Sequence, residues 1–316
     1  MQRASLFFCL VFSLCVNAQE SREYQPQIGV TGTVTSVGSE TMSNLIALWA
    51  AGFNEQYPHV KFQLQTSGSS TAPPALAEGT ANIGPMSRAL KMSERNYFIQ
   101  KHGYEPLQIP VALDAITLFV DVNNPVDKLT RKQVDAIFSA TRFCGANRSV
   151  TRWTELNDNA TNQGSIVLFG RNAVSGTYGL FKKYALCDGD FRAKVKELPS
   201  SASVVQSVAF SESALGYAGY GFLGAGVKSL AISVDGEQFV APTAANISEG
   251  AYPFSRTLYL LVNKKPGEPL EKLVKEFVLF ILSKQGSQIL SGEGYVPVSD
   301  EQKRMIFRNL NAASRS

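Results

Sequence analysis

The stretch from Gly170 to Phe181 has the residue types and spacing of a site for a small oxyanion. An apolar run at 165–169 before it predicts a buried strand, and the residues at 178–186 predict a helix. The first amides of a helix have no acceptor within the helix, and the helix start carries a partial positive charge. The turn adds a guanidinium, two hydroxyls and a glycine that lets an anion approach the backbone: Arg171, Ser175, Thr177 and Gly176. The alternative is an ordinary capped helix beside a surface arginine.

Three earlier turns share this pattern, and each follows a predicted strand. They are Gly38-Ser39-Glu40-Thr41 after the strand at 30–37, Ser67-Gly68-Ser69-Ser70 after the strand at 60–65, and Gly84-Pro85-Met86-Ser87-Arg88, which ends a short strand. In open α/β sheets, ligands bind outside the carboxyl ends of the strands, so we expect all four turns at one edge. None has the glycine spacing of a P-loop or a dinucleotide fingerprint, which favours a small oxyanion over a nucleotide. For the first turn, the alternative is a plain helix cap by Ser39 or Thr41.

The periodicity of the remaining chain predicts an α/β fold. Further strands are expected at 214–222, 230–240 and 257–262, and an apolar run at 109–123 is interrupted by Asp114. The expected helices lie at 42–53, 73–78, 92–100, 129–138, 191–196, 202–210 and 268–283, the last continuing to 290.

Composition places the chain among ordinary globular proteins with room for two domains. Of its 316 residues, 44% are hydrophobic and 18% are charged, and the formal net charge is +4. The basic residues form no block and are not interleaved with aromatic ones, so no nucleic-acid partner is expected. His59 and His102 lie far from each other and from the cysteines, so we expect neither a metal site nor a cofactor.

Residues 1–18 have the pattern of a secretory signal peptide. A short basic start precedes an apolar core at 6–16 that is too short to span a bilayer, and cleavage is expected after Ala18. Leu14 fits a lipobox poorly, which disfavours lipidation at Cys15.

Removal of the signal peptide leaves one pair of cysteines, Cys144 and Cys187, in an exported chain. We predict a disulfide between them. The chain-entropy model gives it a stabilisation of roughly 4 kcal/mol at most. The alternative is two unrelated buried thiols.

The chain resembles the periplasmic phosphate-binding proteins of phosphate ABC transporters. The resemblance rests on the four turns and extends from about Val30 to about Val298, and Arg171 with Ser175-Gly176-Thr177 is its most specific part. Other matching segments are Leu113-Asp114-Ala115-Ile116, Leu129-Thr130, Trp153 and Tyr252-Pro253-Phe254-Ser255-Arg256.

This resemblance implies a two-lobed periplasmic binding protein fold, type II-like, in which each lobe is a mixed sheet flanked by helices and two crossover strands form the hinge. Lobe 1 is expected to comprise residues 19–115 and 257–316, and lobe 2 the inserted residues 116–256. The hinge strands are expected near 115–120 and 256–260. The implied function is high-affinity binding of inorganic phosphate in the cleft and its delivery to an inner-membrane ABC permease. The protein is therefore expected to be a periplasmic monomer and not an enzyme.

The resemblance also implies a ligand set. Its members are Ser39, Glu40, Thr41, Ser69, Ser70, Ser87, Arg88, Arg171, Ser175, Gly176 and Thr177. The set departs from the family at Ser87, because some members have an aspartate there that accepts the proton of bound phosphate. Our hypothesis is that Glu40 supplies this acceptor and that Arg88 balances its charge. The alternative is a solvated Glu40 in the first turn of a helix, where the helix dipole favours it.

Other functions stay open from the sequence. Another oxyanion, such as sulfate or molybdate, fits if the proton acceptor is absent. An exported phosphate-ester hydrolase would use Ser39, Ser69 or Ser175 as nucleophile, but the chain has no Gly-x-Ser-x-Gly elbow and no histidine near these serines. An extracellular adhesion or phosphate-sensing protein on the same scaffold is the third alternative.

Overall fold

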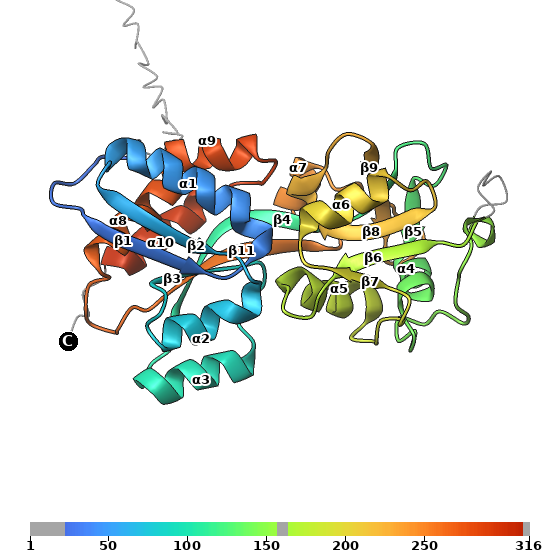
Figure 1. The fold of residues 1–316 in the computed structure, drawn as a ribbon, viewed down its shortest axis with the longest axis horizontal. Coiled ribbons are helices and arrows are strands. Elements are labelled where there is room, and N and C mark those ends of the chain that lie inside the picture. Colours follow the sequence, from blue (N-terminus) through green and yellow to red (C-terminus); the bar gives the residue numbers. More distant parts are fainter. Residues whose placement is uncertain (1–22, 157–163, 312–316) are drawn as a thin grey trace, which may run out of the picture.

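The computed structural model describes residues 23–156 and 164–311, and the predicted signal peptide lies outside them. The chain folds into two lobes joined by two long strands, β4 (Leu107–Asp121) and β11 (Ser255–Val262) (Figure 1). These strands pair antiparallel, with Arg256 opposite Asp114. The two-lobed α/β architecture with a mixed sheet confirms the expected fold class.

Within the described residues, one nine-stranded mixed sheet runs through both lobes. In lobe 1 its order is β2 (Val60–Gln65), β1 (Gly32–Val37), β3 (Ile83–Met86), β11 and β4. In lobe 2, β4 pairs with β8 (Ala214–Gly219) and β9 (Val227–Ser229), and β8 is followed by β6 (Val167–Arg171) and β7 (Lys196–Leu198). Because β1 is parallel to both β2 and β3, the turns that follow these three strands lie at the same edge.

The core of lobe 1 combines helices from both ends of the chain. Helix α1 (Ser43–Gln56) packs against α8 (Lys272–Leu282) and α9 (Lys284–Gly292), and the buried indole of Trp49 in α1 donates to the carbonyl of Gly286 at 2.9 Å. Helices α2 (Ala72–Ala77) and α3 (Met92–His102) form a separate apolar cluster with residues of β3 and β11.

Lobe 2 has its own core around stacked aromatic rings. The ring of Phe181 in α5 (Gly176–Leu186) lies 3.8 Å from that of Tyr217 in β8, centroid to centroid, and the two are nearly parallel. The lobe also contains α4 (Arg131–Phe138), α6 (Ser201–Ala209), α7 (Ala244–Ser248), and a small parallel pair of β5 (Lys128–Thr130) with β10 (Ala231–Ser233). The two main apolar clusters share no residue, so each lobe has a core of its own.

Most predicted helices and strands are confirmed to within a few residues, but the helix expected at 191–196 is wrong. Phe191 forms an isolated bridge with Ser139, and the residues after it lead into β7, which pairs with β6. Six residues are too few for a helix to be stable without tertiary packing.

The C-terminal helices also differ from expectation. The helix predicted from 268 begins only at Lys272, because the carboxylate of Glu271 accepts from the first amides of α8. Ser283 then ends α8 and caps α9 instead of continuing one helix. Helix α10 (Asp300–Asn311), which packs against α8, was not predicted. All helices within the described ranges fall short of the length and apolarity that a membrane span needs.

The predicted disulfide between Cys144 and Cys187 is confirmed, at a sequence separation of 43. Cys187 ends α5 in a left-handed backbone conformation, with φ of 51°. The disulfide therefore anchors the end of α5 that lies away from Ser175.

We expect a chain with both Cys144→Ser and Cys187→Ser to unfold at a lower temperature than the wild type. Without the cross-link, the unfolded chain regains an entropy worth roughly 4 kcal/mol at most. For a chain of this size, that corresponds to a fall in Tm of about 5–15 °C. Differential scanning calorimetry of both proteins in one buffer measures the shift, and equal melting temperatures would contradict a stabilising role.

Candidate functional site

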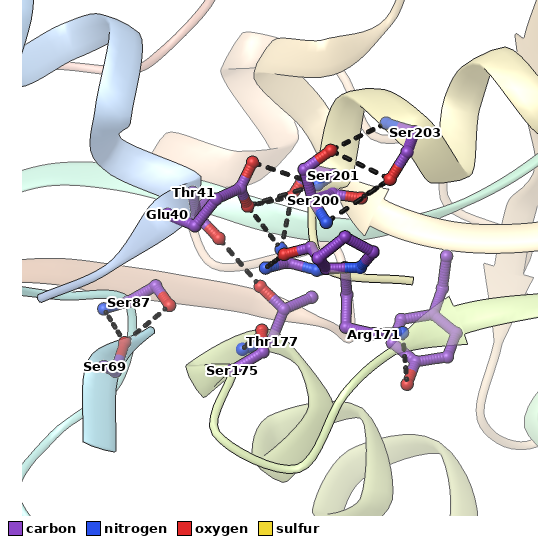
Figure 2. Close-up of polar contacts among 12 residues, drawn as sticks. Glu40, Thr41, Ser69, Ser87, Arg171, Ser175, Thr177, Ser200, Ser201 and Ser203 are labelled. Atoms are coloured by element: carbon purple, nitrogen blue, oxygen red, sulfur yellow. Dashed lines mark hydrogen bonds and ion pairs between the residues drawn. The ribbon is translucent and has the colours of Figure 1, made fainter. Parts of the chain in front are cut away.

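The four turns singled out in the sequence meet where the lobes face each other (Figure 2). Three of them follow β1, β2 and β3 of lobe 1, and the fourth follows β6 of lobe 2. The first two open into short 3-10 helices, η1 (Glu40–Met42) and η2 (Ser69–Thr71), and the fourth opens directly into α5. Figure 2 shows Glu40 and Thr41 directed toward Arg171 and Thr177 of the opposite lobe.

Direct contacts connect the turns across the lobes. The hydroxyls of Thr41 and Thr177 lie 3.0 Å apart, and both residues are buried. The amide of Ser70 donates to the carbonyl of Val174 at 3.2 Å. The turns of lobe 1 thus touch the start of α5 through both side chains and backbone.

Gly176 sits at the tightest point of this contact. A Cβ built at Gly176 would lie 2.5 Å from the hydroxyl oxygens of both Ser69 and Ser87. Real Cβ atoms essentially never come so close to other atoms, so a larger residue here would force the hydroxyls of Ser69 and Ser87 or the facing turns to shift.

Arg171 is a deeply buried cation of the site, with a side chain that is 1% exposed. Its Nη1 donates to Ser201 Oγ at 2.6 Å and pairs with Glu40 Oε2 at 2.7 Å. Its Nη2 donates to the carbonyl of Pro199 at 2.9 Å, whereas Nε has no hydrogen-bond partner among the described residues. Burial lowers the pKa of Arg171, and the negative charge of Glu40 counteracts this shift. Since buried polar groups are normally paired, this Nε–H is a donor that still lacks an acceptor.

The structure corrects the charge pairing that we expected for Glu40 and Arg88. Arg88 pairs with Glu94 through two contacts, of 2.5 and 2.8 Å, and does not balance Glu40. Glu40 is not solvated either. Both of its carboxylate oxygens accept from the amide of Ser201, the first residue of α6, at 3.1 Å, and its partner cation is Arg171.

The serine residues in the turns of lobe 1 differ in their hydrogen-bond partners. Ser39 is buried, but its side chain does not cap η1, and its amide donates to the carbonyl of Pro85 at 2.7 Å. The hydroxyl of Ser70 accepts from Arg88 at 3.1 Å. The hydroxyl oxygens of Ser69 and Ser87 lie 3.1 Å from each other, and both residues are fully buried.

Backbone amides orient two of the hydroxyls. Ser69 Oγ accepts from the amide of Ser87 at 3.0 Å, and Ser175 Oγ accepts from the amide of Thr177 at 3.1 Å as the cap of α5. A hydroxyl has one hydrogen, so an oxygen that accepts a hydrogen bond from an amide can still donate its own hydrogen to a different group. Each hydroxyl therefore keeps its hydrogen for another acceptor, which for Ser69 includes the hydroxyl oxygen of Ser87.

Sequence reasoning missed three residues that contact this site. Ser201 binds Glu40 and Arg171, and no sequence signal marks it. Arg256 donates to Thr177 Oγ1 at 2.8 Å and pairs with Asp114. A charge inside the apolar run at 109–123 was the available signal for Asp114, because a buried carboxylate needs a cationic partner. Among the described residues, no cluster of His, Cys, Asp or Glu has the arrangement of a metal site.

Known proteins match this chain over most of its length. The family model of the PBP superfamily domain matches residues 25–285. The phosphate-binding protein PstS of Pseudomonas aeruginosa is 50% identical over 290 residues, which cover 91% of this chain and 90% of that protein. A solved structure from Clostridium perfringens with bound phosphate, assigned as a phosphate ABC transporter substrate-binding protein, has a TM-score of 0.71 at 26% identity and covers 85% of this chain and 100% of that chain. An ABC-type phosphate transport receptor from Vibrio cholerae shares the fold, with a TM-score of 0.64 at 23% identity and coverage of 83% and 99%.

Proposed function

Since the chain belongs to the PBP superfamily and, within it, to the family of the phosphate-binding protein PstS, we propose that it binds inorganic phosphate between its lobes. The observation that carries this proposal is the convergence of Arg171 and the start of α5 with three hydroxyl-bearing turns of lobe 1. Bound phosphate is then delivered to an inner-membrane ABC permease for uptake.

Each lobe contributes donors of a different kind in this proposal. Lobe 2 supplies the Nε–H of Arg171 and the hydroxyls of Ser175 and Thr177. It also supplies the first amides of α5 other than that of Thr177, which have no acceptor within the helix. Lobe 1 supplies hydroxyls, among them those of Thr41 and Ser69. Hydrogen bonds to an ionised group are about twice as strong as neutral ones. Several of them together support micromolar or tighter binding, which corresponds to about 8 kcal/mol.

Entry of phosphate requires the lobes to separate, because Thr41 and Thr177 are in direct contact. We propose that β4 and β11 bend to open the site. The lobe boundaries are then residues 19–115 with 257–316 for lobe 1, and 116–256 for lobe 2. With this division, the buried pair of Asp114 and Arg256 lies at the boundary, where β4 and β11 pass from one lobe to the other.

The proposed location, oligomeric state and role of the protein rest on the same family membership. We propose export to the periplasm through the signal peptide at 1–18, action as a monomer without a cofactor, and a role in transport rather than catalysis. Assay of a chromogenic phosphate ester with added divalent metals separates this role from that of a hydrolase, which would release product.

A panel of anions tests the proposed function. Purified mature protein, dialysed free of phosphate, is titrated by calorimetry with phosphate, arsenate, sulfate and molybdate. We expect micromolar or tighter binding of phosphate and weaker binding of sulfate and molybdate. Tighter binding of sulfate or molybdate than of phosphate would overturn the assignment.

We expect Glu40→Gln to lower the preference for phosphate over sulfate by at least about tenfold. Phosphate keeps a proton at neutral pH and sulfate does not, and a site built around one polar contact strongly rejects a ligand that cannot make it. Glu40 Oε1 accepts only from Ser201 within the described residues, so this oxygen has lone-pair capacity for the ligand proton.

Calorimetric titration with both anions measures the preference of the Glu40→Gln variant. Glu94→Gln is the matched control, because Glu94 pairs with Arg88 in the same lobe and does not contact Arg171. An unchanged ratio of the two affinities in Glu40→Gln would rule out Glu40 as the acceptor.

A further inference from the structure

Arg256 is held at the junction of the lobes by a buried carboxylate. It lies on β11 opposite Asp114 on β4, and both side chains are 1% exposed. The Nε and Nη2 of Arg256 donate to Asp114 Oδ2 at 2.8 and 2.5 Å. Gly219 packs against this pair, because a Cβ there would lie 3.0 Å from Arg256 Nη2. The guanidinium is rigid and planar, so these contacts also fix the direction of its third nitrogen, Nη1.

That third nitrogen reaches a residue of the proposed phosphate site. Arg256 Nη1 donates to Thr177 Oγ1 at 2.8 Å. A guanidinium has no acceptor, so the hydroxyl oxygen of Thr177 must be the acceptor in this contact. The hydroxyl hydrogen therefore points away from Arg256, toward Thr41 Oγ1 at 3.0 Å or toward an anion between the lobes.

We propose that Arg256 is a positioning residue that directs the hydroxyl hydrogen of Thr177 toward bound phosphate. This inference rests on the proposed function and adds a residue outside the expected ligand set. Without the Nη1–H donor, the oxygen of Thr177 no longer has a fixed partner behind it, and its hydroxyl can rotate. Its oxygen would then face the phosphate with a lone pair, and one favourable hydrogen bond would be replaced by repulsion.

A purely structural role for Arg256 makes a different prediction. Arg256 and Asp114 connect the two crossover strands, so their loss could weaken binding by loosening the junction between the lobes. A loss of that kind would occur whether or not residue 177 carries a hydroxyl. The two roles are therefore separated by the dependence of the Arg256 effect on Thr177.

The test is a double-mutant cycle on phosphate affinity, measured by calorimetry in the mature protein. Arg256→Lys keeps a cation for Asp114 but loses the fork that reaches Thr177. Thr177→Val removes the hydroxyl at nearly constant volume, and Thr177→Ser keeps it. We expect Arg256→Lys to raise the Kd about tenfold with threonine or serine at 177, and less than about twofold with valine there.

Arg192→Lys is the matched control, because Arg192 donates to the carbonyls of Ile137 and Val150 in lobe 2 and does not contact Thr177. Its effect on the Kd should be small and the same with threonine or valine at 177. Thermal unfolding of each variant verifies that it folds, and Arg256→Gln provides a second substitution if the lysine variant does not fold.

Three results bear on the inference. The expected dependence on the hydroxyl supports it. An equal loss with Thr177 and with Thr177→Val, or no loss in Arg256→Lys, would overturn it while leaving phosphate binding by the wild type intact. Absence of phosphate binding by the wild type itself would overturn both this inference and the proposed function.

Discussion

Replacement of Gly176 by alanine is expected to raise the Kd for phosphate at least about 100-fold, because the added methyl group prevents the two lobes from closing on the ligand. The Cβ would lie 2.5 Å from the hydroxyl oxygens of Ser69 and Ser87 and 3.1 Å from the Cβ of Ser69. Both serines are fully buried, so neither can move aside into open space. We expect the clash to be relieved by a movement of lobe 1 away from the start of α5, which breaks the contacts that surround the anion.

Gly179→Ala is the matched control for Gly176→Ala. Gly179 lies in the same helix, and a Cβ there would have no neighbour within 4 Å. We expect it to keep phosphate affinity and to raise stability slightly, by about 0.5–1 kcal/mol, because alanine is the better helix former. Calorimetric titration and thermal unfolding of both variants measure these effects. Equal affinities of Gly176→Ala and Gly179→Ala would contradict the proposed contact of the lobes around Gly176.

Replacement of Arg171 by alanine is expected to weaken phosphate binding at least tenfold and, by the usual strength of a hydrogen bond to a charged group, on the order of 100-fold. Its Nε–H is a buried donor without a partner among the described residues, and its Nη1 holds Glu40 across the lobes. The variant thus loses a ligand donor and also leaves the carboxylate of Glu40 without its cation, beside the incoming dianion.

Calorimetry with phosphate measures the effect of Arg171→Ala, and Arg148→Ala serves as its control. The side chain of Arg148 is also in lobe 2, but it is 71% exposed and pairs with Glu155 at the surface. We expect Arg148→Ala to bind phosphate like the wild type. Full affinity in Arg171→Ala would show that the anion binds elsewhere.

The local elements of the site were predictable because each is a strand, a turn and a helix in sequence. The strand at 60–65 has the predicted bounds, and the turn after it opens into η2 and α2 close to where proline and small residues indicated a helix. That the turns share one edge follows from the parallel pairing of β1 with β2 and β3. Local pattern and sheet geometry together therefore sufficed for these parts.

The side-chain partners across the lobes were not predictable in the same way. Arg88, which we expected to balance Glu40, instead pairs within lobe 1 with Glu94, six residues later, whose carboxylate also accepts from the amide of Lys91. Glu40 finds Ser201 at a separation of 161 residues. The partner of a long charged side chain depends on which lobe faces it after folding, and neither periodicity nor turn chemistry contains that information.

The way the chain crosses between lobes also bears on how the protein folds. Asp114 and Arg256 are partners although 142 residues separate them, and the core of lobe 1 needs residues from before and after that interval. The entropy of loop closure must be overcome before such distant segments gain from their contacts. The buried core residues of lobe 2 all lie between Ala115 and Phe254, and we expect the folding of this segment to bring the two crossover strands together. We therefore expect lobe 2 to form first, although the ribosome makes the first part of lobe 1 earlier. Before lobe 2 has formed, β3 lacks its neighbour β11. Strands β1 to β3, which are made first, then expose apolar surface to solvent or to chaperones.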